Sequence, residues 1–188
     1  MRTSIIVVMA LALVGCRAHL PTEPPMTATR SYDFRFGTEN AGYFEISDTG
    51  REITMNAVFA MDGQTYENPF AVRHDGQRVT AYRCGDGEWQ ALPPGSDKYP
   101  TSAYPLLVPR VRDRLTYVAI NEGSGEEHPD TELVRTGGIV TESRGGKVSR
   151  VFHVDAERGI WKIEWGGGAV SELRAGKAEA LAGSPIRE

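Results

Sequence analysis

Apolar and polar residues alternate with a period of two along most of the chain from Ser31 onward. In the first such segment, 31–36, aromatic residues at every second position alternate with Ser, Asp and Arg. Because successive side chains of a β-strand point to opposite faces, this pattern predicts a strand with one face buried. About eleven short segments of this kind lie between Ser31 and Arg174. In one of them, Trp161, Ile163 and Trp165 are expected to share a face.

Turns rich in glycine separate these segments. Asp-Gly steps stand at 62–63 and 75–76, and glycine pairs stand at 137–138 and 145–146. Such pairs favour two-residue hairpins, because both central residues of a type I′ turn need a positive φ. No segment has the length and 3.6-residue period of a crossover helix. We therefore expect an all-β fold, an antiparallel meander of about eleven strands. Because so many strands tend to curl or split, its sheet should be strongly curved, as a half-barrel, a barrel or a two-layer wrap.

One long segment departs from this rhythm. Residues 93–112 contain five Pro, and Pro105 and Pro109 exclude a long helix. Thr101 or Ser102 could cap one short helical turn within it. The segment is expected either to plug one end of the sheet or to form a lid over an apolar cavity.

The first sixteen residues have the organisation of a secretory signal. One basic residue precedes an apolar run from Ile5 to Leu13 that is too short to cross a bilayer core as a helix. The run ends in Leu13-Val14-Gly15-Cys16, which resembles the lipobox of bacterial lipoproteins. The resemblance implies cleavage before Cys16, a diacylglycerol on its sulfur and an acyl group such as palmitate on its new amino group. An ordinary signal peptide with a chance Cys is the alternative.

The resemblance also indicates a location and a domain organisation. Arg17, rather than Asp, follows the lipidated Cys, which implies the periplasmic face of the outer membrane if the source is Gram-negative and the cell membrane otherwise. We expect a signal peptide at 1–15, a lipidated tether with three Pro at 16–30, a single β domain at 31–175 and a C-terminal tail at 176–188. The tail should form one turn near 177–181 and then fray.

Composition and charge narrow the class of protein. The 188 residues are 40% hydrophobic and 24% charged, as in an ordinary globular domain. The formal net charge of −4 gives no support for nucleic-acid binding. The chain has 2 Cys. With Cys16 lipidated, Cys84 has no intramolecular partner and is expected to be a small buried apolar residue rather than a reactive thiol.

Motifs for catalysis and metal binding are missing from the sequence. It has no His-x-x-x-His, Cys-x-x-Cys, Gly-x-Ser-x-Gly or phosphate-loop pattern. His153 and Asp155, two apart on a predicted strand, could orient an imidazole, but we favour a solvated polar pair. The acidic loop 122–130 is expected to be exposed. We therefore expect no cofactor, no metal and no catalytic residues, and keep a hydrolase with an unrecognised site as a minor hypothesis.

Aromatic and apolar side chains remain as candidates for function. A curved sheet can fill with its own side chains, or it can enclose an apolar ligand. The predicted architecture is similar to the LolA/LolB-like half-barrels of the bacterial envelope and to a family of glycolipid-binding meander proteins, and this likeness carries over no residue. The residues expected to contact such a ligand are Tyr99, Tyr104, Leu106, Leu107, Trp161 and Trp165.

We thus expect a membrane-anchored envelope lipoprotein that binds a lipid or another hydrophobic ligand in its sheet. The alternative is a non-catalytic structural or assembly protein that acts through an envelope protein partner.

Overall fold

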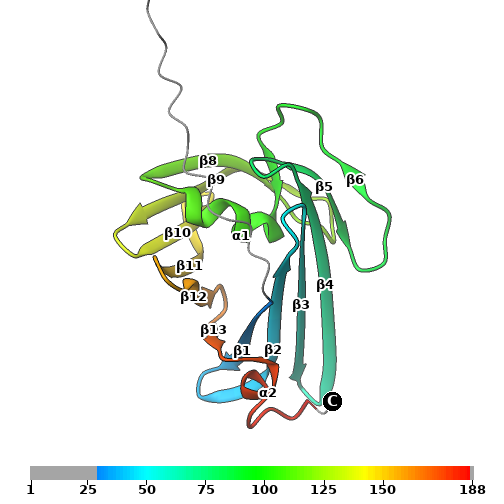
Figure 1. Cartoon of the computed structure of the whole chain (residues 1–188), viewed down its shortest axis with the longest axis vertical. Coiled ribbons are helices and arrows are strands. Elements are labelled where there is room, and N and C mark those ends of the chain that lie inside the picture. Colours follow the sequence, from blue (N-terminus) through cyan, green and yellow to red (C-terminus); the bar gives the residue numbers. More distant parts are fainter. Residues whose placement is uncertain (1–28, 187–188) are drawn as a thin grey trace, which may run out of the picture.

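The chain folds into one β-sheet with three short helical stretches on one face and a short helix on the other (Figure 1). The structure is a computed structural model that describes residues 29–186. The predicted signal peptide, Cys16 and the tether up to residue 28 lie outside the described residues. The strands are β1 (Arg30–Phe36), β2 (Glu39–Asp48), β3 (Glu52–Met61), β4 (Gln64–His74), β5 (Val79–Cys84), β6 (Gln90–Ala91), β7 (Lys98–Pro100), β8 (Arg114–Ile120), β9 (Glu127–Thr136), β10 (Ile139–Arg144), β11 (Lys147–Asp155), β12 (Gly159–Trp165) and β13 (Ala169–Arg174), and the helices are η1 (Thr101–Ala103), α1 (Tyr104–Leu107), η2 (Val108–Arg110) and α2 (Lys177–Ala180).

The strand order of the sheet is β6-β5-β4-β3-β2-β1-β13-β12-β11-β10-β9-β8-β7. Neighbouring strands are antiparallel, except that β7 and β8 are parallel. β1 lies in the middle of this order and pairs with both β2 and β13. The first strand therefore joins the half of the sheet built from β1–β6 to the half built from β7–β13.

The predicted all-β, mostly antiparallel sheet is confirmed, but the predicted strong curvature is wrong. The sheet is neither closed nor strongly curled, and β6 and β7 lie at its two opposite edges. The described residues form thirteen strands rather than about eleven, in part because residues 98–100 of the Pro-rich segment add an edge strand. Residues 101–111 cover the apolar face of the sheet, so neither closure nor a second layer of strands is needed to bury it.

The inner face of the sheet is the face that carries the hydrophobic core. The crossover segment, defined as residues 101–111, packs on this face, and Figure 1 shows α1 between β8–β10 and β3–β5. Its first turn, η1, contacts β4, and its last, η2, contacts β12, so the segment touches both halves of the sheet. The largest core side chains that are fully buried come from both halves: Tyr32, Ile46, Ile53, Val72, Leu133, Val140, Phe152 and Ile163.

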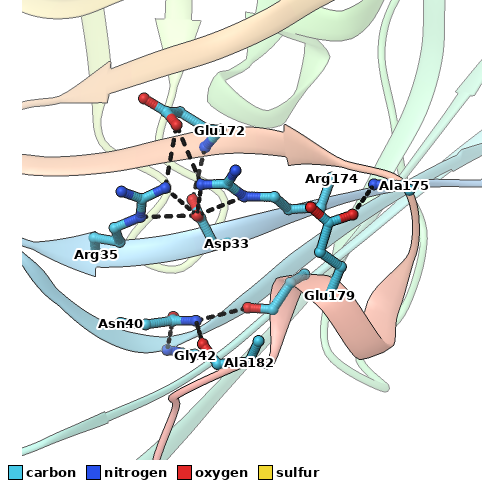
Figure 2. A network of polar contacts seen from close by, with 10 residues as sticks. Asp33, Arg35, Asn40, Gly42, Glu172, Arg174, Ala175, Glu179 and Ala182 are labelled. Atoms are coloured by element: carbon cyan, nitrogen blue, oxygen red, sulfur yellow. Dashed lines mark hydrogen bonds and ion pairs between the residues drawn. The ribbon is translucent and has the colours of Figure 1, made fainter.

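The C-terminal helix α2 packs on the opposite, outer face. Ala180 is buried there against Tyr43 and Val58. Asn40 Nδ2 donates to the carbonyl oxygens of Ala180 and Ala182 at 2.8 and 2.9 Å (Figure 2). The predicted turn is confirmed, whereas the predicted fraying is wrong for the tail up to residue 186, because these contacts hold the tail against β1 and β2.

An ion cluster on the outer face connects β1 to β13. The carboxylate of Asp33 accepts from the Nε atoms of Arg35 and Arg174, each at 2.7 Å, and from the backbone N–H of Glu172 at 2.9 Å (Figure 2). Both arginines also pair with the Glu172 carboxylate. Because β1 and β13 are far apart in sequence, this cluster supports the pairing that joins the two halves of the sheet.

Cys84 is exposed, so its predicted burial is wrong. It is the last residue of β5, and the neighbouring edge strand β6 pairs only with Ala81 and Tyr82. Since no strand continues alongside the end of β5, nothing in the sheet covers the thiol on that side.

Candidate functional site

The crossover segment fills the space over the inner face with its own side chains. Tyr104, Leu106 and Leu107 are between 2 and 5% exposed, and the Tyr104 ring stacks on Phe152 with the centroids 5.1 Å apart. These three predicted ligand contacts are therefore part of the hydrophobic core. This packing favours the interpretation of the segment as a plug.

Polar contacts from the sheet hold both ends of the crossover segment. At its start, the Glu122 carboxylate accepts from Thr101 Oγ1 at 2.6 Å and from the Ser102 N–H at 2.5 Å. At its end, Arg135 Nη2 donates to the Val108 carbonyl at 3.3 Å. The sequence predicted that Thr101 or Ser102 caps the helical turn with its side chain, but neither does so. The Glu122 carboxylate accepts from the N–H at the start of the turn instead. Burial of Glu122 also corrects the prediction that the whole acidic loop is exposed.

A charged pair lies buried beneath the segment. Arg150 Nη2 donates to Glu142 Oε2 at 2.5 Å, and Tyr117 Oη donates to the same oxygen at 3.2 Å. The other oxygen, Oε1, accepts from Ser149 Oγ at 2.7 Å and from Arg144. Burial alone would raise the pKa of Glu142, but Arg150 and then Arg144 hold this pKa at about 2. Glu142 is therefore an ionised carboxylate inside an apolar core.

Several buried polar atoms around the segment have no hydrogen-bond partner among residues 29–186. Four such atoms are Ser102 Oγ, Tyr104 Oη, Arg135 Nε and Arg150 Nε. Ser102 and Tyr104 belong to the segment itself, and the Arg150 guanidinium lies 5.0 Å from the Tyr104 ring. A buried unpaired polar atom costs free energy, so the packed position of the segment is less favourable than a fully satisfied core would be.

Beside the segment, four aromatic rings continue the core along the inner face. We call Phe34, Phe36, Phe59 and Tyr66 the aromatic row. The Phe34 ring stacks on Phe59 with centroids 4.9 Å apart, and Phe59 stacks on Tyr66 at 5.5 Å. Phe36 meets Phe34 edge to face at 5.4 Å. The row therefore runs across β1, β3 and β4 at the end of the sheet where β1 and β3 finish.

Gly42 on β2 makes the stack of Phe34 on Phe59 possible. Its register partners are Phe34 on one side and Phe59 on the other. Because Gly42 has no side chain, the two rings approach each other across it. A Cβ atom at Gly42 would lie 2.0 Å from the Val58 carbonyl oxygen, which shows how closely β2 and β3 approach at this point.

The aromatic row is only partly covered. Phe36 is 36% exposed and Tyr66 is 37% exposed, and Met61 beside them is 41% exposed. Tyr66 is uncovered because β5 pairs only with residues 70–74 of β4, which leaves a free edge along the part that carries Tyr66. Pro69 stands directly before the residues that pair with β5, which fits this free edge because proline is confined to edges or bulges of a sheet. These partly exposed side chains leave apolar surface open at this end of the inner face.

The remaining predicted ligand residues lie at different places. Trp165 adjoins both the crossover segment and the aromatic row, with its ring 6.1 Å from Tyr104 and 6.3 Å from Phe34. Tyr99 packs edge to face on Tyr117 at the β7 edge, at 5.8 Å. Tyr99 and Trp165 nevertheless pack against the same inner-face core that contains Tyr104, Leu106 and Leu107, so among the six predicted residues Trp161 alone lies apart.

Trp161 does not share a face with Ile163 and Trp165, which corrects that prediction. On β11, the adjacent residues His153 and Val154 pair with residues 162 and 160 of β12, so Trp161 between these two has no partner on β11. Its ring lies on the outer face, 5.3 Å from the His153 ring. A β-bulge adds one residue to a strand, so the residues before the bulge point to the face opposite to the one that strict alternation predicts.

The sequence pattern places the rings of the aromatic row on strands, but it does not mark them as a site. The hydrophobic alternation shows which residues share a face of one strand, but it does not show which rings meet across three strands. The residue that could have revealed the row is Gly42, because a glycine inside a strand often marks a close approach of its neighbours.

The three histidines within residues 29–186 each lie close to a carboxylate. His153 Nε2 lies 2.9 Å from Glu164 Oε1, whereas the Asp155 carboxylate binds Arg158. Lys162 and then His153 hold the pKa of Glu164 below its usual range. Within residues 29–186, no group of three His, Cys, Asp or Glu side chains is placed to hold a metal ion. In the same residues, no helix has the length and apolar character needed to cross a bilayer.

Comparison with known proteins gave no match: no family model, no curated protein and no solved structure is similar to this chain at a significant level.

Proposed function

We propose that this chain is a lipid-anchored protein of a bacterial cell envelope that binds the acyl chain of a lipid, or a similar hydrophobic ligand, on the aromatic row. One observation carries the proposal. The row continues the inner-face core beyond the crossover segment, and its outermost rings stay more than a third exposed. Covering apolar surface is favourable by roughly 25 cal/mol per Å², so a ligand lying on these rings gains free energy from the contact.

The shape of the row suits a long and narrow ligand. From Trp165 on β12 to Tyr66 on β4, the rings cross five strand intervals. Successive ring centroids from Trp165 through Phe34 and Phe59 to Tyr66 are 6.3, 4.9 and 5.5 Å apart, so this path is at most about 17 Å long. Trp165 lies where the row meets the crossover segment, next to the buried polar atoms that lack partners.

Removing the outermost rings tests the proposal. In the purified full chain, we expect 9,10-dibromostearate to quench tryptophan fluorescence, because bromine quenches a ring that it contacts and Trp165 adjoins the row. Replacing both Phe36→Ser and Tyr66→Ser should raise the Kd for this probe about tenfold or more, through the lost apolar contact. Since both rings are partly exposed, the variant should stay folded.

Ile139→Ser is the matched control, because Ile139 is 41% exposed, about as much as the two rings. Its neighbour Val140 points into the core, so Ile139 lies on the outer face of the sheet, away from the aromatic row. The control should bind dibromostearate as the unchanged chain does. Equal weakening by the control and by the double variant would refute the row as the site. Absence of saturable quenching in the unchanged chain would refute acyl-chain binding and favour the assembly role through a protein partner.

The proposed anchor predicts a separate result. Cys16→Ser removes the sulfur to which diacylglycerol would attach, and two or three acyl chains are what give stable anchoring. We therefore expect most of the Cys16→Ser protein to leave the membrane fraction on cell fractionation. Cys84→Ser is the control and should stay in that fraction, because its exposed thiol lies in the folded domain. If the Cys16→Ser protein remains membrane-bound, lipid anchoring at this residue is wrong.

A further inference from the structure

A second candidate site lies on the outer face of the sheet, away from the aromatic row. A pocket of about 230 Å³ is lined by residues of β2, β3, β4 and β5 and by the turn after β5. Glu45 and Asn56 line it, and each alternates with core residues of its strand, which places both on the outer face. The pocket is smaller than the roughly 300–1,000 Å³ that is usual for drug-sized ligands, so its size suits a small metabolite.

Two residues that line this same pocket each carry a buried polar atom without a hydrogen-bond partner. Across residues 29–186, six buried side-chain atoms lack a hydrogen-bond partner, and the two that are not near the crossover segment are Asn56 Oδ1 and Arg83 Nε. Asn56 Nδ2 donates to Glu67 Oε1 at 2.9 Å. Because an ionised carboxylate only accepts, this bond fixes the orientation of the amide and leaves Oδ1 as an unused acceptor.

Arg83 brings a positive charge to the pocket. Its guanidinium lies 5.0 Å from the Trp89 ring, and Arg73 lies on the same ring at 3.9 Å. Arg73 pairs with Glu52, whereas Arg83 forms no ion pair with any carboxylate in the described part of the chain. A guanidinium held by an aromatic ring but lacking a counter-ion is suited to bind a ligand carboxylate.

The pocket also has acidic side chains, together with Ser47 and Thr54, whose hydroxyl groups can donate or accept hydrogen bonds. Glu45 and Asp86 both line it, and Glu45 accepts from Ser31 Oγ at 3.0 Å. These carboxylates and Asn56 Oδ1 attract an N–H donor with a positive charge, and they repel an anion with two charges such as phosphate. The pocket thus presents a donor for an anionic group and acceptors for a cationic group within a small volume.

We propose that this pocket binds a small zwitterion of the amino-acid class, with the carboxylate on Arg83 and the ammonium group on Asn56 Oδ1, Glu45 and Asp86. The site is independent of the acyl-chain site, because the two lie on opposite faces of the sheet. The protein would therefore hold a polar metabolite on one face and an apolar chain on the other.

Titration of the isotope-labelled full chain by NMR tests this second site. We expect saturable shifts at Asn56 and Arg83 with L-alanine in the millimolar range, and much weaker shifts with acetate, methylammonium or inorganic phosphate. Arg83→Gln should raise the Kd for L-alanine at least tenfold, and Asn56→Ala should raise it about fivefold. Arg83→Lys keeps the charge without the planar donors and should bind with intermediate affinity.

Arg158→Gln is the matched control, because Arg158 also lies over a tryptophan ring, 5.3 Å from that of Trp161, but far from the pocket. It should bind L-alanine like the unchanged chain. Thermal unfolding of each variant shows that it is folded. Acetate or phosphate binding as tightly as L-alanine would overturn the zwitterion assignment. No saturation at 20 mM of L-alanine, set as roughly the limit of weak binding, would overturn the site.

Discussion

Glu142→Gln is expected to lower the free energy of unfolding by about 3–5 kcal/mol at neutral pH. Gln keeps the shape of the side chain and still accepts the hydrogen bond from Tyr117, but it carries no charge. Arg150, 7% exposed, then remains as a buried cation without its counter-ion. Removing one partner of a buried ion pair lowers the free energy of unfolding far more than removing both partners. The remaining charge is then buried away from water and has no opposite charge to stabilise it. Urea denaturation at pH 7 measures the change.

Two further variants separate the buried charge from other effects. The double variant Glu142→Gln with Arg150→Met should recover much of the lost stability, because no unpaired charge stays in the core. Glu132→Gln removes a carboxylate from the neighbouring strand β9, where Glu132 pairs with the largely exposed Arg114. Such a surface pair is worth about 1 kcal/mol or less. If Glu142→Gln costs no more than Glu132→Gln, the buried pair does not stabilise the fold.

The same residue predicts how stability changes with pH. The pKa of Glu142 is about 2 in the folded chain, against an ordinary value of 4.5. Because folding lowers this pKa, the stabilisation is fully present above about pH 4.5 and is lost as the pH falls from 4.5 towards 2. The contribution at neutral pH is about 3 kcal/mol. The stability difference between the unchanged chain and Glu142→Gln should therefore shrink below pH 4.5, and a constant difference down to pH 2.5 would contradict the ionised carboxylate.

Gly42→Ala is expected to destabilise the chain by about 3 kcal/mol, at the upper end of the range for overpacking. The new Cβ would meet the Val58 carbonyl oxygen at 2.0 Å and the Phe59 Cα at 2.7 Å, and backbone atoms cannot rotate away as a flexible side chain can. β2 and β3 must separate locally, which also pulls Phe59 away from Phe34. Thermal unfolding should show the lost stability, and dibromostearate should bind more weakly to the variant at temperatures where it is folded.

Gly176→Ala is the control for this substitution. Gly176 has an extended backbone with φ of 177°, and a Cβ there would meet no atom within 4 Å. The control should be neutral or slightly stabilising, because alanine loses less conformational freedom on folding than glycine. Equal stability of the Gly42→Ala and Gly176→Ala chains would mean that β2 and β3 do not approach as closely as described, and that Gly42 does not support the aromatic row.

The buried pair shows where sequence analysis stops. Glu142 follows the core residue Val140 by two positions, and Arg150 precedes Phe152 by two, so the alternation places both charges on the inner face. This pattern in two consecutive strands could have predicted a buried ion pair. The pattern alone does not establish such a pair, because a charged residue on a predicted strand is most often exposed and only the pairing of β10 with β11 brings the two together.

Other differences have the same origin. Glu122 is buried because the crossover segment presents Thr101 and Ser102 to it, and the sequence around Glu122 shows only an acidic loop. The face on which Trp161 lies depends on a bulge between β11 and β12, which no local pattern predicts. The open shape of the sheet follows from the crossover segment, because a segment that covers the apolar face removes the need for closure.

By itself, the sequence determined the elements of this protein: the alternating strands, the turns, the antiparallel meander and the Pro-rich segment that interrupts it. These are set by φ preferences and by the period of two, which act between residues close in the chain. Only the tertiary structure decided which charges are buried, which rings meet across Gly42 and which aromatic surface stays uncovered. Those features depend on contacts between distant segments, and such contacts leave no periodic pattern along the chain.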